Sequence, residues 1–114
     1  MRKANENSIE WSYFLGNEKK DTITIKYILS NDGRKVIEFV IIYTTLINEI
    51  PKEVIKYDVS KKEKMHTHYN YQNPPKKIFI EKDISIKTII EIVEYIEKNW
   101  IKMKLKFMEK ESII

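Results

Sequence analysis

The sequence predicts an α+β fold, in which an antiparallel meander sheet of five or six strands has one long C-terminal helix packed on one face. Two observations carry this prediction. Residues 9–82 contain short runs of alternating apolar and polar side chains, separated by turn-forming residues, and this pattern is typical of antiparallel strands. In residues 83–110, apolar side chains instead recur every three or four positions, which is the spacing of one helix face.

The first strands are predicted at residues 9–14 and 22–30, where apolar and polar side chains alternate. Asp32-Gly33 then predicts a tight hairpin turn, because such turns need positive φ angles. Residues 36–47 are apolar on both phases and rich in β-branched side chains, so they are expected to form a long central strand. Residues 48–51 are expected to end it, since they include a proline.

A further hairpin is predicted over residues 54–71, with a polar loop at its tip, and it carries both histidines of the protein. Antiparallel pairing around this loop places Asp58 opposite His66 and Lys56 opposite His68. Side chains of a strand alternate between the two faces of the sheet, so these four lie on one face. We expect that face to be exposed to solvent.

The same alternation divides the other side chains of this hairpin. Asn70 falls on the face of the histidines. The opposite face is expected to join the core and carries Ile55, Tyr57, Val59, Met65, Tyr69 and Tyr71.

After the prolines at 74 and 75, residues 77–81 predict a last, short edge strand. Asp83 is the predicted N-cap of the helix, with Ser85 as the competing residue. The end of the helix carries a second apolar row among lysines, formed by Ile101, Leu105 and Met108. These lysines suit a helix C-terminus, but the row can also dock on a nucleic acid, an antitoxin-like protein or a second copy of the chain in a homodimer.

Length and composition limit the kinds of protein that this sequence can encode. A chain of 114 residues predicts one domain, with residues 1–8 as a disordered polar tail. A net charge of +4 allows an anionic partner without requiring one, and the absence of cysteine excludes thiolate metal sites. No signal peptide or membrane span is visible, which predicts a cytoplasmic protein without a membrane partner. The richness in lysine and isoleucine is typical of an AT-rich genome and of thermophiles.

Two histidines beside a carboxylate and an amine can divide acid and base roles. The reaction that uses this set without a metal is RNA transesterification, in which His66 and His68 share the proton transfers. Lys56 would stabilise the charge on phosphorus, and Asp58 would orient one imidazole. The residues predicted to contact the substrate are Tyr57, Tyr69 and Asn70, and the two tyrosines can stack on a base only if they are not buried.

Two alternatives remain open. His66, His68 and Asp58 also supply three ligands with an open position, which is typical of a catalytic zinc or manganese site. The histidines can equally be ordinary polar residues on a solvated face of a non-catalytic interaction module. Phosphate-binding glycine loops and nucleophile elbows are absent from the sequence.

Lys56-Tyr57-Asp58 followed by His66-Thr67-His68 resembles a group of small uncharacterised archaeal and bacterial proteins related to TumE-like toxins of toxin–antitoxin pairs. That group has a strand ending in Arg/Lys-Tyr-Asp, a short polar loop, a His-x-His strand and a terminal helix with an aromatic residue such as Trp100. The resemblance covers residues 11–107, but residues 69–75 replace a Gly-rich acidic stretch. It implies a cytoplasmic toxin that acts on nucleic acid and is neutralised by a DNA-binding antitoxin.

Overall fold

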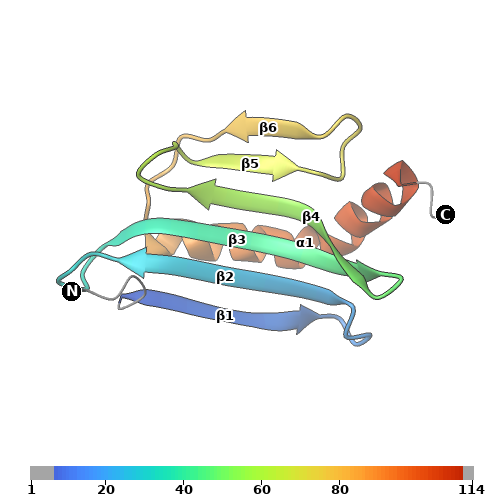
Figure 1. The fold of residues 1–114 in the computed structure, drawn as a ribbon, viewed down its shortest axis with the longest axis horizontal. Coiled ribbons are helices and arrows are strands. Elements are labelled where there is room, and N and C mark those ends of the chain that lie inside the picture. The colour runs from blue at the N-terminus through green and yellow to red at the C-terminus, as the bar shows by residue number, and fades with distance from the viewer. Residues whose placement is uncertain (1–6, 112–114) are drawn as a thin grey trace.

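Six strands pair in chain order in the computed structural model, which describes residues 7–111, and one helix follows them (Figure 1). The elements are β1 (Ser8–Leu15), β2 (Asp21–Leu29), β3 (Val36–Ile47), β4 (Ile50–Val59), β5 (His66–Tyr69), β6 (Lys76–Phe79) and α1 (Ile86–Lys110). Every neighbouring pair is antiparallel, so the sheet is a simple meander with β1 and β6 at its edges. The predicted fold class is therefore confirmed.

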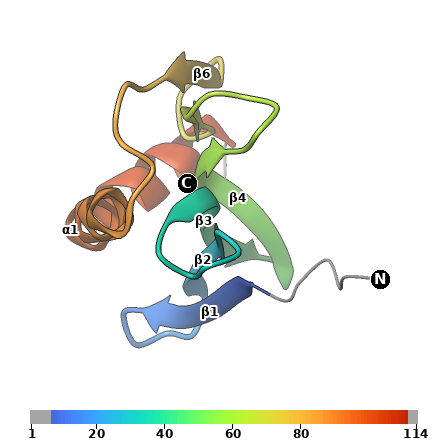
Figure 2. The same cartoon turned by 90° about the vertical axis from the view of Figure 1, so that its left-hand side faces the viewer.

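Helix α1 lies on one side of the sheet, as Figure 2 shows with the sheet nearly edge-on. It packs mainly against β3 and to a smaller extent against β4. The core between the two layers is built from isoleucines of the inner strands and of the helix, including Ile23, Ile25, Ile41, Ile55 and Ile96, each exposed by 1% or less. Among residues 7–111, no element covers the other side of the sheet, which we call the open face. Within the same range, no helix has the length and apolarity needed to cross a membrane.

The turn between β3 and β4 is tighter than the sequence predicts. Asn48 and Glu49 have φ angles of 53° and 66°, as the two central residues of a type I′ turn require. Strand β4 therefore begins at Ile50, ahead of the predicted start at residue 54. Pro51 is tolerated because it pairs with Leu46, one position beyond the hydrogen-bonded pair that closes the turn, where β3 needs no N–H donor.

The turn between β2 and β3 is instead longer than predicted. Residues 30–35 form a loop closed by a hydrogen bond of 2.7 Å from the Ser30 N–H to the Lys35 carbonyl. Asp32 stabilises this loop by accepting hydrogen bonds from the Ser30 hydroxyl and the Arg34 N–H. Gly33 adopts a φ of +74°, as expected, but within a loop rather than a two-residue turn.

The helix begins three residues later than the predicted residue 83. Ser85 is its N-cap, because its backbone is extended and its hydroxyl accepts the N–H of Thr88 at 3.2 Å. The prediction of Asp83 as the N-cap is therefore wrong. At the other end of the chain, residues 1–6 of the predicted disordered tail lie outside the described residues, while Ser8 begins β1.

A buried polar network joins the start of β2 to the second half of the helix. The Asp21 carboxylate, 1% exposed, accepts a hydrogen bond of 2.7 Å from the Tyr43 hydroxyl and one of 3.0 Å from the Lys104 ammonium. Burial, followed by the bond to Asp21, raises the pKa of Tyr43, which keeps its hydroxyl a donor. The Trp100 ring packs edge-on against Tyr43 and closes the network from the side.

Candidate functional site

Both predicted histidine pairs are present in the hairpin of β4 and β5. Asp58 lies opposite His66 and Lys56 lies opposite His68. Strand β5 is shorter than predicted, because it spans residues 66–69 instead of 65–71. It pairs on its other side with β6, whose Phe79 lies opposite His66.

On the open face, the register aligns these pairs with residues of the other strands, which gives two parallel rows of side chains across the sheet. One row consists of Glu10, Lys26, Val40, Asp58, His66 and Phe79. The next row consists of Ser12, Thr24, Ile42, Lys56, His68 and Lys77. Directly opposed residues of neighbouring strands have Cβ atoms about 4.5–5.5 Å apart, so the imidazoles sit in a continuous ladder of side chains.

His66 is buried, although the sequence predicts it on a solvated face. Its exposed fraction is 2%, and its Nδ1 lies 2.7 Å from the Lys64 carbonyl oxygen. A carbonyl only accepts hydrogen bonds, so Nδ1 is the nitrogen that carries the proton. The Phe79 ring covers the imidazole from β6 at a centroid distance of 5.8 Å. His66 therefore cannot meet a substrate directly, and its predicted role in proton transfer to substrate is not supported by this geometry.

Glu63, in the loop between β4 and β5, belongs to the site although it is not among the residues predicted from the sequence. Its carboxylate lies 3.5 Å from Nε2 of His66 and accepts a hydrogen bond from the Lys77 ammonium. That bond, with a smaller contribution from His66, holds the pKa of Glu63 below its usual value. Its position three residues before His66 was visible in the sequence, but the partner Lys77 comes from β6.

Asp58 interacts with both rows of the open face. Its carboxylate lies 3.8 Å from Nζ of Lys56 and 4.0 Å from Nε2 of His66. Both separations are ion-pair distances and exceed those of a hydrogen bond. Asp58 therefore makes no hydrogen bond to His66 and does not fix its tautomer, which the Lys64 carbonyl does instead.

His68 is the accessible imidazole of the pair, because its side chain is only half-buried. It packs edge-on against His66 with a centroid distance of 4.9 Å and an interplanar angle of 82°. Lys56 lies opposite it on one side and Lys77 on the other. The accessible histidine is thus flanked by two primary amines on the same face.

The geometry does not support the three residues predicted to contact the substrate. Tyr57 pairs with Thr67 and Tyr69 with Ile55, which puts both tyrosines on the helix-facing side of the sheet. Tyr57 is also 6% exposed, so it is a core residue. Asn70 follows β5, and its side-chain amide donates a 2.5 Å hydrogen bond to the Glu53 carboxylate, which occupies it.

The geometry gives the metal alternative no support. Within residues 7–111, no group of three histidine, aspartate or glutamate side chains is arranged to hold a metal ion. One nitrogen of His66 is engaged with a backbone carbonyl, and Phe79 covers the ring. The predicted set of His66, His68 and Asp58 is therefore a cluster of charge and hydrogen-bond contacts.

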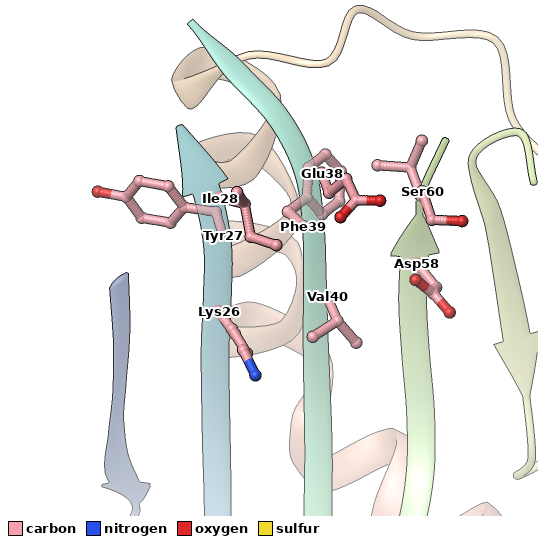
Figure 3. Close-up of a pocket in the computed structure, with 9 residues that line it drawn as sticks. Lys26, Tyr27, Ile28, Glu38, Phe39, Val40, Asp58 and Ser60 are labelled. Atoms are coloured by element: carbon pink, nitrogen blue, oxygen red, sulfur yellow. The ribbon is translucent and has the colours of Figure 1, made fainter. Parts of the chain in front are cut away.

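A shallow hollow adjoins the site on the open face. Figure 3 shows Lys26, Val40 and Asp58 side by side on β2, β3 and β4, with Glu38 and Ser60 beyond them. The hollow has a volume of about 190 Å³. It extends the site from Asp58 toward the middle of the sheet.

These contacts define what the site can do chemically. Lys56 and Lys77 lie on either side of His68, and their ammonium groups are paired with the carboxylates of Asp58 and Glu63. His66, which lies close to the carboxylates of Asp58 and Glu63, packs edge-on against His68. The site therefore combines one accessible imidazole with two neighbouring lysine–carboxylate pairs.

Comparison with known proteins identifies the family and gives no activity. No curated protein and no solved structure matches the chain. One family model, described as a domain of unknown function (DUF7718), matches residues 3–113. Because this match covers nearly the whole sequence, the chain belongs to the DUF7718 family.

Proposed function

We propose that this protein is a toxin-like ribonuclease that cleaves RNA by metal-independent transesterification at His68. The observation that carries the proposal is the cross-strand row in which His68 stands between Lys56 and Lys77 on the open face. A phosphodiester is the anion that such a row suits, because its charge needs cations and its cleavage needs proton transfer.

In the proposed reaction, one imidazole first removes a proton from the RNA and later returns it. The His68 imidazole takes the proton of the ribose 2′-hydroxyl, and the 2′-oxygen attacks the adjacent phosphorus. The ammonium groups of Lys56 and Lys77 stabilise the negative charge that builds on the phosphate oxygens. The bond from phosphorus to the 5′-oxygen then breaks, and the 5′-oxygen leaves with the proton that the His68 imidazolium returns.

His66 is a positioning residue in this mechanism. Its Nδ1 bond to the Lys64 carbonyl and its edge-on contact with His68 restrict the orientation of the reacting imidazole. This division of labour differs from the one that the sequence predicts, in which the two histidines share the proton transfers.

The products test the chemistry. Incubation with a short RNA should yield 2′,3′-cyclic phosphate and 5′-hydroxyl ends, detectable by mass spectrometry, at the same rate with and without EDTA. The same oligonucleotide with a 2′-deoxyribose at the cleaved position should be resistant, because it lacks the nucleophile. Cleavage of the deoxy substrate, or loss of activity in EDTA, would contradict the proposed reaction.

A second candidate is a non-catalytic module that associates through α1. Ile101 and Leu105 are 58% and 53% exposed, and they lie one turn apart on the same side of the helix. Large apolar side chains exposed in this arrangement are typical of a docking surface. In a twofold homodimer, Ile101 of one copy can pack against Leu105 of the other. The two candidate functions are compatible if an antitoxin binds to Ile101 and Leu105 of a toxin that cleaves RNA.

Leu105→Asp tests whether the exposed side chains of Ile101 and Leu105 form a docking surface. A charge in the centre of an apolar contact should convert an assembly, measured by light scattering, into monomer. Lys102→Asp, at another exposed position of the same helix, is the matched control and should leave the assembly in place. A wild-type protein that is monomeric at every concentration would remove the homodimer from consideration.

A further inference from the structure

Phe79 is an exposed aromatic residue beside the histidine site. Its side chain belongs to edge strand β6 and is 59% exposed, although phenylalanine has no polar atom that favours contact with water. One part of the ring covers His66 at 5.8 Å between centroids, and Nζ of Lys77 lies 5.4 Å from the ring centre. The exposed remainder of the ring is therefore next to the row of Lys56, His68 and Lys77.

This juxtaposition matches the chemical pattern of a nucleotide. A nucleotide joins a flat apolar base to a charged phosphate, so a protein that binds it places an aromatic ring near cations. Phe79 provides the ring, while Lys77 and His68 on the neighbouring row provide the cation and the imidazole. The tyrosines that the sequence predicts for this purpose lie on the other side of the sheet.

We propose that Phe79 stacks on a base of single-stranded RNA and thereby places the neighbouring phosphate over His68. The inference rests on the proposed function and names its substrate class. Bases in a duplex are stacked on one another inside the helix, so their faces are not free to contact a side chain. A base of a single strand can turn out and lie on the ring. Double-stranded RNA is therefore excluded from productive binding at this site.

The chain contains a matched control for this proposal. Phe14 lies in β1, at the opposite edge of the sheet, and also belongs to the open face, because it pairs with Thr22. Its exposed fraction is 54%, close to that of Phe79. It lies on an edge strand separated from β5 by three intervening strands. Phe14→Ala removes the same side chain from a similar environment without touching the site.

The experiment compares wild type, Phe79→Ala, Phe79→Trp and Phe14→Ala. Binding of a fluorescently labelled single-stranded RNA is followed by anisotropy, and cleavage is measured on the same oligonucleotide. Phe79→Ala should weaken binding by about tenfold, which corresponds to the loss of one base stack. Phe79→Trp and Phe14→Ala should bind as wild type does. Duplex RNA of the same sequence should compete poorly with the single strand.

A substrate with an abasic position beside the cleaved phosphate isolates the stack. Wild type should bind this abasic RNA as much more weakly than the intact strand as Phe79→Ala binds the intact strand more weakly than wild type does. The Phe79→Ala variant should bind the abasic and the intact RNA equally well. Equal effects of Phe79→Ala and Phe14→Ala would overturn the stacking inference while leaving the cleavage proposal intact. Phe79-dependent binding without cleavage would overturn the proposed function but support the stacking of Phe79 on a base. Absence of single-strand binding by wild type would overturn the inference.

Discussion

Lys104→Met is expected to destabilise the protein by about 3 kcal/mol, because breaking a buried ion pair leaves an uncompensated charge. Asp21 is 1% exposed and would retain only the hydroxyl of Tyr43 as a partner. The expected loss is the lower end of the range for buried pairs, since the Lys104 side chain is 19% exposed and solvent screens part of the interaction. For a chain of this length, it corresponds to a fall in Tm of roughly 12 °C.

Urea unfolding followed by tryptophan fluorescence measures this effect, since Trp100 lies against Tyr43 in the network. Lys106→Met, at an exposed position of the same helix, is the control and should change stability by less than about 0.5 kcal/mol. Adding Asp21→Asn to Lys104→Met should recover part of the loss, because an amide is less costly to bury than a carboxylate. If Lys104→Met and Lys106→Met are equally stable, the ion pair does not stabilise the fold.

His68→Ala is expected to lower the rate of RNA cleavage by roughly 100- to 10,000-fold, which is the usual contribution of a general acid or base. His68 is half-buried, and within residues 7–111 its side chain makes no hydrogen bond to the protein, so the free energy of unfolding should change little. His68→Gln should be equally inactive, because glutamine keeps the polarity and cannot carry the proton. Rates come from gel assays, and stability comes from the urea curves.

His66→Ala provides the contrast. This residue is 2% exposed and bonded to the Lys64 carbonyl, so its removal should reduce stability as well as activity. The two variants therefore separate a residue that reacts from one that supports it. A His68→Ala protein with wild-type cleavage would remove His68 from the mechanism.

The pairing of the histidine hairpin was predictable because it depends on local information. The loop length and the alternation of side chains together fix Asp58 opposite His66, and a slip by one residue would turn Tyr57 out of the core. The strand bounds of β3 were predictable for the same reason, since its β-branched run is continuous between two turns.

The burial of His66 was not predictable from the same hairpin. Its cover comes from Phe79, and the partner of Glu63 is Lys77, so both depend on how β6 pairs with β5. Two prolines precede β6, so the sequence does not indicate the register in which β6 pairs with β5. Local alternation assigns a residue to a face, but burial on that face depends on strands that lie beyond the hairpin.

The turn at Asn48-Glu49 was missed because it contains no glycine, although both residues adopt positive φ angles. The N-cap was ambiguous because two good capping residues, Asp83 and Ser85, stand two positions apart. The ion pair of Asp21 and Lys104 joins residues 83 positions apart, and the lysine resembles its solvated neighbours in sequence. Such long-range partners follow only from the packing of α1 on the sheet.

The order of the elements along the chain has a consequence for biosynthesis. Each strand pairs with the one made just before it, so the sheet can assemble progressively as the chain leaves the ribosome. Helix α1 is made after all six strands, and until it docks, the isoleucine-rich side of the sheet has no cover. The nascent protein is therefore prone to aggregate until α1 docks, and a chain truncated before residue 86 remains prone to aggregate.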